Sequence, residues 1–149
     1  MACVHEFNHS DEVRHLKPYG DSVKYIRKLA NKGFEFIAVT SLSDNSTAGM
    51  NRCWNLREIF GNVFTEVHCL KVGESKQQIL SDKWGGTGYL WIEDHFKNAE
   101  AGYEVGLSPL LVDTAHNREF ETKLFPRISE HKPWEEIYTL AMTHYQVDK

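Results

Sequence analysis

The chain has 149 residues, 41% of them hydrophobic and 26% charged, which is ordinary for one soluble globular domain spanning residues 1–149. Its net charge of -4 and pI near 6.0 argue against nucleic-acid binding, because phosphate backbones attract clustered Lys and Arg. Its three cysteines show no close pairing, which fits a reducing cytoplasm, and no apolar run approaches the roughly 18 residues of a membrane span.

Helical and extended patterns alternate along the chain. Apolar residues at helical spacing predict helices over 21–33 and 50–60 and from 133 onward, the first of them capped by Asp21 or Ser22. Further helices are predicted over 75–84, after a glycine turn, and over 96–105. Short apolar runs predict strands over 34–39, 63–70, 88–92 and 110–112. Strands separated by single helices imply right-handed crossovers. The sequence therefore predicts an α/β fold, a Rossmann-like three-layer sandwich with a mostly parallel sheet, whose ligands lie outside the carboxyl ends of the strands.

Two hydroxyl residues, Thr40 and Ser41, directly follow the predicted strand 34–39. A hydroxyl and backbone N–H groups at that edge can hold a phosphoryl oxygen, helped by the N-terminus of the following helix. Ser or Thr after a strand is also a common helix cap, and the residues alone leave both interpretations open.

A lysine, Lys76, stands at the start of the predicted helix 75–84. An ammonium group placed there could neutralise a phosphate and the carboxylates around it. The alternative is a solvated surface lysine.

Two adjacent acids, Glu93 and Asp94, end the predicted strand 88–92. Two carboxylates at the end of a buried strand repel each other unless a cation lies between them. Mg²⁺ suits such a site, because it takes carboxylate oxygens and keeps several waters. The alternative is a helix cap in which Asp94 accepts backbone N–H bonds.

Together these three sites resemble the motifs of the haloacid-dehalogenase-like (HAD) phosphohydrolase superfamily in order and spacing. The acidic pair precedes the stretch Asn98-Ala-Glu-Ala-Gly102, which is similar to that family's N-A-x-A-G helix, and residues 17–33 are similar to the lead-in to its second motif. The resemblance covers about residues 16–117 and leaves 1–15 as an atypical segment. It implies that Thr40 and Ser41 bind phosphoryl oxygens, that Lys76 steadies the phosphoryl and nucleophile charges, and that Glu93 and Asp94 hold Mg²⁺.

The family's first motif, D-x-D, is the point where the chain departs from the resemblance. The first aspartate of that motif attacks phosphorus and the second is the general acid and base. Residues 1–16 contain no such motif: after a strand over 3–7, Asn8 and Ser10 would occupy the two aspartate positions, and neither can replace a carboxylate. Three arrangements are open: residues 2–7 form a degenerate first strand, its two neighbours pair directly, or the chain is the remainder of a longer one. We favour a degenerate first strand or a truncated chain.

A second motif, His5-Glu-Phe-Asn-His9, matches H-E-x-x-H of zinc peptidases. That motif needs a helix to bring both imidazoles onto one face, and this segment has no helical apolar stripe. We treat a zinc peptidase as a remote alternative.

The sequence thus predicts a HAD-like phosphohydrolase, or its truncated remnant, that acts with Mg²⁺ on a small phosphorylated metabolite such as a nucleotide or a sugar phosphate. The spacing between Thr40 and Lys76 leaves no room for a large cap. The alternative from another class is a non-catalytic HAD-like module that binds a ligand or a partner, with a homo-oligomer as one way to complete its sheet.

Overall fold

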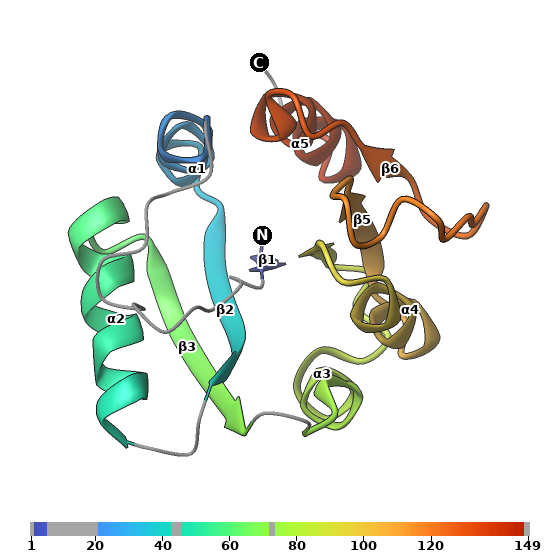
Figure 1. The fold of residues 1–149 in the computed structure, drawn as a ribbon. Coiled ribbons are helices and arrows are strands. Elements are labelled where there is room, and N and C mark those ends of the chain that lie inside the picture. The colour runs from blue at the N-terminus through green and yellow to red at the C-terminus, as the bar shows by residue number, and fades with distance from the viewer. Residues whose placement is uncertain (1, 6–20, 43–45, 72–73, 148–149) are drawn as a thin grey trace.

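The computed structural model of the protein describes residues 2–5, 21–42, 46–71 and 74–147, which form one twisted sheet flanked by helices (Figure 1). The sheet has six strands in the order β3-β2-β1-β4-β5-β6, and every pair of neighbours is parallel. The strands are β1 (Ala2–His5), β2 (Glu35–Leu42), β3 (Phe64–Lys71), β4 (Leu90–Glu93), β5 (Ser108–Val112) and β6 (Arg127–Ile128). The predicted α/β fold with a parallel sheet is confirmed.

Five helices cover the two faces of this sheet and give it three layers. They are α1 (Ser22–Asn31), α2 (Ser46–Phe60), α3 (Lys76–Trp84), α4 (Phe96–Glu104) and α5 (Pro133–His144). In Figure 1, α1 and α5 lie together on one side of the sheet, and α3 and α4 lie together on the other. In the part of the chain that is described, no helix combines the length and the apolar character that a membrane crossing requires.

The core is divided between the two faces by the alternation of side chains along each strand. Phe36 and Ala38 of β2 pack in one cluster with residues of α1, α2 and α5. Ile37 and Val39 pack in a second cluster with Leu80 and other residues of α3 and β4. Both faces of β2 are therefore buried, as the continuous apolar run of its sequence predicts.

The first strand of the sheet is present and lies in the central position. Val4 is paired with Ile37 of β2 on one side and with Trp91 of β4 on the other. Direct pairing of β2 with β4 is therefore wrong, because β1 occupies the slot between them and satisfies their backbone groups. Asn8 and Ser10 lie outside the described residues.

Thr40 and Ser41 were predicted to follow strand β2, but they belong to it. β3 is long enough to continue the ladder, so that Thr40 is paired with Cys69 and Ser41 with Leu70. The prediction ended the strand at the last apolar residue, whereas the backbone pairing continues to Leu42.

Asp21 has a different role from the predicted one. It is the N-cap residue of α1, but its side chain makes no hydrogen bond to that helix. Its two carboxylate oxygens instead accept the backbone N–H groups of Trp134 and Glu135, at 3.1 and 2.9 Å, in the first turn of α5. The side chain therefore caps a helix 113 residues further along the chain.

Candidate functional site

Lys76 is the first residue of α3, whose start is fixed by a cap. The Ser75 hydroxyl accepts the backbone N–H of Gln77, and Ser75 itself is extended. The Lys76 side chain points inward from this first turn and is only 2% exposed. The interpretation of Lys76 as a solvated surface residue is therefore wrong.

The Lys76 ammonium lies between strands β2 and β4 at the carboxyl end of the sheet. Its Nζ donates to the carbonyl oxygen of Val39 at 3.5 Å and lies 3.8 Å from Oε2 of Glu93. The ring of Trp91 is 5.8 Å from the same Nζ. A cation is thus placed beside two strands that flank β1.

Glu93, the last residue of β4, is buried, and its two carboxylate oxygens have different surroundings. Oε1 accepts the backbone N–H groups of Asp94 and His95, both at 3.0 Å, just before α4 begins. Oε2 faces Lys76 and has no hydrogen-bond partner within the described ranges. Glu93 therefore makes the backbone contacts that the cap interpretation assigned to Asp94.

Burial opposes charge on both members of this pair. Desolvation lowers the pKa of Lys76 to about 8, although Glu93 and Asp94 favour its charged form. Desolvation likewise raises the pKa of Glu93 to about 8, although Lys76 favours its ionised form. Ionisable groups whose pKa values are shifted by burial beside a specific charged partner cluster at functional sites, which makes this pair a candidate site.

Asp94 lies at the same edge of the sheet, partly buried, next to two histidines. Its side chain is 14% exposed, and its Oδ2 lies 3.8 Å from Nε2 of His116. The rings of His95 and His116 are 6.3 Å apart, and burial lowers the pKa of His95. The two acids of the predicted pair thus differ, with Glu93 internal and Asp94 accessible.

Thr40 is fully buried and follows Val39, the residue whose carbonyl accepts the Lys76 bond. Alternation along β2 puts Thr40 on the face of Phe36 and Ala38, opposite the face of α3. A ligand shared by Thr40 and Lys76 would therefore have to lie across the carboxyl end of β1. Ser41, the other predicted phosphoryl contact, is partly buried.

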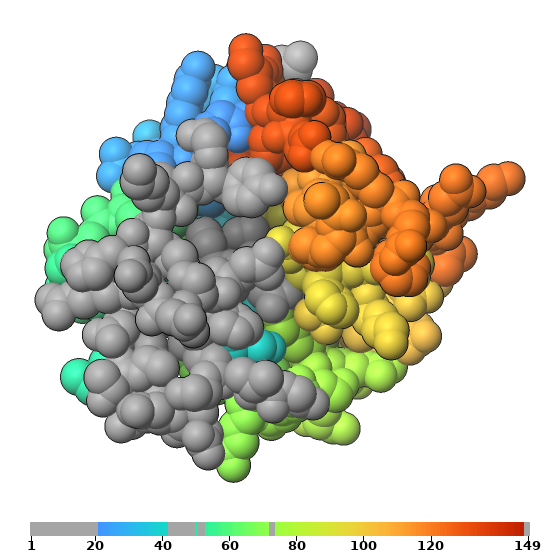
Figure 2. Space-filling model, in the orientation of Figure 1, coloured from blue at the N-terminus to red at the C-terminus, as the bar shows by residue number. Residues whose placement is uncertain are grey.

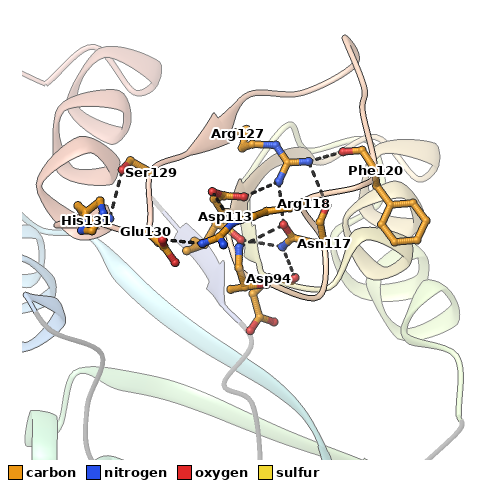
Figure 3. A network of polar contacts seen from close by, with 11 residues as sticks. Asp94, Asp113, Asn117, Arg118, Phe120, Arg127, Ser129, Glu130 and His131 are labelled. Carbon is orange, nitrogen blue, oxygen red and sulfur yellow. Dashed lines mark hydrogen bonds and ion pairs between the residues drawn. The ribbon is translucent and has the colours of Figure 1, made fainter.

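A network of polar side chains after β5 is hydrogen-bonded to the backbone of Asp94 (Figure 3). The Asn117 amide is fully buried and donates to the backbone carbonyl of Asp94 at 2.6 Å and to that of Val112 at 2.8 Å. Arg127 of β6 donates to Asn117 and to Asp113. The sequence prediction missed these residues; the mostly polar segment 113–117 directly after a buried strand marks a region of interest but not the role of Asn117.

The described residues fit Mg²⁺ in part. The accessible Asp94 carboxylate and the unbonded Oε2 of Glu93 are oxygens of the kind that Mg²⁺ binds, with waters and phosphate oxygens supplying the rest. Within the described ranges, no group of three or more His, Cys, Asp or Glu side chains is placed to hold a metal. The binding of a cation here would therefore depend on Asp94, on water molecules and on the oxygens of a bound phosphate.

The zinc-peptidase motif does not have the required conformation at its first residue. His5 is the last residue of strand β1, whereas H-E-x-x-H has to lie on a helix. Residues 6–9 lie outside the described residues. The remote zinc-peptidase alternative is therefore disfavoured.

Comparisons with known proteins identify the fold. The chain superimposes on two D,D-heptose 1,7-bisphosphate phosphatases, one from Burkholderia thailandensis and one from B. bronchiseptica, with TM-scores of 0.69 and 0.68. Both alignments cover 95% of this chain and nearly all of the other, at 10% and 13% identity; the second structure is complexed with magnesium and phosphate. A dehalogenase in an intermediate complex gives 0.61 over 86% of this chain and 58% of its own, at 13% identity. The fold is therefore HAD-like.

The sequence itself has a curated relative. It is 37% identical over 80 residues to an uncharacterized 32.4 kDa protein of the Gp30-rIII intergenic region of Enterobacteria phage T4. The match covers 54% of this chain and 28% of that protein, so the chain spans little more than a quarter of its relative. No family model matches the chain.

Proposed function

We propose that the carboxyl edge of the sheet binds the phosphoryl group of a small phosphorylated metabolite, such as a nucleotide or a sugar phosphate, together with Mg²⁺. The observation that carries the proposal is the buried pair of Lys76 and Glu93, 3.8 Å apart, on a HAD-like sheet with Asp94 beside it. Burying the two groups carries a desolvation cost that works against their attraction, so the pair is weak evidence of a role in stability. An anion-binding role gives a reason to place an ammonium group at this edge.

The chemistry assigned to each residue follows from its surroundings. The Lys76 ammonium, held by the Val39 carbonyl, would attract phosphoryl oxygens. Thr40 and Ser41 follow Val39 along β2, and Thr40 would reach the same ligand only across the end of the sheet. Asp94 would be the main carboxylate for the metal, with Oε2 of Glu93 as a second oxygen. Mg²⁺, when bound, would neutralise phosphoryl charge. The residues themselves orient the group, and such positioning is a large part of phosphoryl-transfer catalysis.

Hydrolysis needs a further group that the sequence does not supply. A carboxylate aimed at phosphorus and a second one to move the proton are required, and residues 1–16 contain no D-x-D. This absence favours the second candidate function, a HAD-like module that binds a phosphorylated ligand or a partner without turning it over.

Thermal melts with and without Mg²⁺ test the metal site. Mg²⁺ at a hundredfold its dissociation constant should stabilise the protein by about 2.7 kcal/mol, and Asp94→Asn should abolish this stabilisation. Asp82→Asn, at an exposed acid on α3, is the matched control and should keep the response. If the unmodified protein does not respond to millimolar Mg²⁺, the metal is not part of the site.

A further inference from the structure

The buried side chain of Asn117, next to the backbone of Asp94, has all of its hydrogen-bonding groups occupied. The Nδ2 of Asn117 donates to the carbonyl oxygens of Asp94 and Val112, and its Oδ1 accepts the backbone N–H of Thr114 at 3.2 Å. The same Oδ1 accepts Nη1 of Arg127 at 2.7 Å. An amide offers two donors and two acceptor sites, so this set of four bonds defines its orientation.

The guanidinium of Arg127 in turn holds Asn117 in place. Its Nη2 donates to the Asn117 carbonyl at 3.2 Å and also to the carbonyl of Phe120, while Nη1 contacts Oδ1 of Asp113 at 2.9 Å. Arg127 belongs to β6, which pairs with β5. The connection between the two strands, which projects from the surface beside α4 in Figure 2, is thus tied back to the sheet.

The bond from Asn117 reaches the residue at which strand β4 turns into helix α4. Asp94 lies between Glu93, whose Oε1 accepts two backbone N–H groups, and His95, the N-cap residue of α4. The turn is therefore held on one side by the Glu93 carboxylate and on the other by the Asn117 amide. Fixing the Asp94 carbonyl restricts the backbone from which the Asp94 carboxylate projects.

We infer that Asn117, oriented by Arg127, is a positioning residue that sets the direction of the Asp94 carboxylate for the bound cation. The effect of Asn117 on cation binding rests on the proposed Mg²⁺ site. Its effect on the backbone at Asp94 does not. A residue of this kind acts through another residue. Partners behind a metal ligand typically change metal affinity by about 10–100-fold when they are mutated.

The sharpest variant is Asn117→Asp. It keeps an oxygen for Thr114 and Arg127 but replaces the donor that faces the Asp94 carbonyl with a second acceptor. Asn117→Ala removes both halves of the amide. If either variant fails to fold, Arg127→Gln is the substitute, because Arg127 is partly exposed and its loss releases Asn117 indirectly.

Two readouts decide the inference. The first is the dissociation constant of Mg²⁺, taken from the Mg²⁺ dependence of melting of the full chain. The second is native-state hydrogen exchange of the Asp94 and His95 amides, which donate to Glu93. The control is Asp21→Ala, which removes a helix cap in α5 without touching this turn.

The inference predicts that both Asn117 variants raise the Mg²⁺ dissociation constant about tenfold or more. It also predicts faster exchange confined to the Asp94 and His95 amides, whereas Asp21→Ala leaves the dissociation constant unchanged. An unchanged Mg²⁺ affinity in the Asn117 variants overturns the inference, as does exchange that is unaltered or accelerated throughout the chain.

If the unmodified protein binds no Mg²⁺, the metal part of the proposed function fails, and the exchange experiment alone decides. Local acceleration at Asp94 and His95 then supports Asn117 as the residue that positions Asp94. Its absence overturns that role as well.

Discussion

Lys76 and Glu93 form a buried pair of ionisable groups at the carboxyl edge of the sheet. Each side chain is almost completely buried, and their nearest charged atoms are 3.8 Å apart, too far for a hydrogen bond between them. Water is excluded from both groups, yet Oε2 of Glu93 receives no hydrogen bond among the described residues. A cation at this edge would supply a partner for this oxygen.

The raised pKa of Glu93 predicts a specific pH dependence of stability in the absence of metal. Burial raises this pKa from 4.5 to about 8, so folding takes up a proton at Glu93 between these values. The free energy of unfolding contributed by this carboxyl therefore declines as the pH rises. Lys76, with a pKa lowered to about 8, is charged in both the folded and the unfolded state through most of that window.

The measurement is urea unfolding at pH 5, 6, 7 and 8 in the presence of EDTA, for the unmodified protein and for Glu93→Gln. We expect the difference in unfolding free energy between them, unmodified minus variant, to fall as the pH rises. A difference that is constant or that grows would contradict this, and would mean that Lys76 keeps Glu93 ionised in the folded state.

Gly102 of α4 is required by its contact with Trp91. A Cβ added at this position would lie 2.3 Å from Cδ1 of the indole, which is itself fully buried and donates to the Asn98 carbonyl at 2.9 Å. A shift of the ring to make room would disturb that bond and the packing around it. We expect Gly102→Ala to destabilise the protein by about 1–3 kcal/mol through overpacking.

Denaturant unfolding of Gly102→Ala, beside the exposed Lys97→Ala on the same helix, measures this effect. The control should stay within about 0.5 kcal/mol of the unmodified protein. A Gly102→Ala variant as stable as the control would mean that the tryptophan is not held as described.

The helix α5 depends on a cap from a distant part of the chain. Its N-cap residue, Lys132, has a left-handed backbone with φ 51° and makes no side-chain cap bond, so the two bonds from Asp21 take that role. We expect Asp21→Ala to destabilise the protein by about 1 kcal/mol, the usual cost of losing a cap.

Chemical denaturation is again the test, with Asp82→Ala, at an exposed acid on α3, as the comparison. Equal stability of the two variants would show that Asp21 contributes nothing to α5.

The difference between the predicted and the observed role of Asp21 shows what local sequence can provide. A polar residue before an apolar stripe signals a helix start, but not which helix receives its oxygens. The same limit explains β6, because the two residues Arg127–Ile128 are too few to show a period. The longer helices α3 and α4 were predicted to within one residue of their observed ends.

The site residues that could be predicted from the sequence are those at the ends of regular helices and strands. Lys76, Glu93 and Asp94 stand at predicted helix starts and strand ends, so their placement at the carboxyl edge follows from the order of the elements. Asn117 could not be assigned, because its role depends on hydrogen bonds to Asp94 and Val112 across neighbouring strands. The burial of Lys76 also required the packing of α3 on the sheet.

For the molecule as a whole, the position of β1 is decisive. The strand lies between β2 and β4, where by the resemblance the nucleophile of HAD-like phosphohydrolases would project, and residues 1–16 contain no D-x-D. We therefore expect little or no phosphatase activity from this chain. The assay is a panel of nucleotide and sugar monophosphates with Mg²⁺, beside Lys76→Ala.

Turnover near the usual enzyme median of about 10 per second, lost in the Lys76→Ala variant, would contradict this expectation. It would mean that another acid, such as Glu6 or Asp11, supplies the carboxylate.

The central claim, that this edge binds a phosphoryl group through Lys76, is tested most directly by calorimetric titration of inorganic phosphate in the presence of Mg²⁺. We expect saturable binding to the unmodified protein and binding at least about tenfold weaker to Lys76→Met, because a charge-assisted hydrogen bond is lost. Lys97→Met, which removes an exposed lysine of α4, should bind as the unmodified protein does. Equal affinity in Lys76→Met, confirmed as folded by circular dichroism, or no binding to the unmodified protein, would contradict the claim.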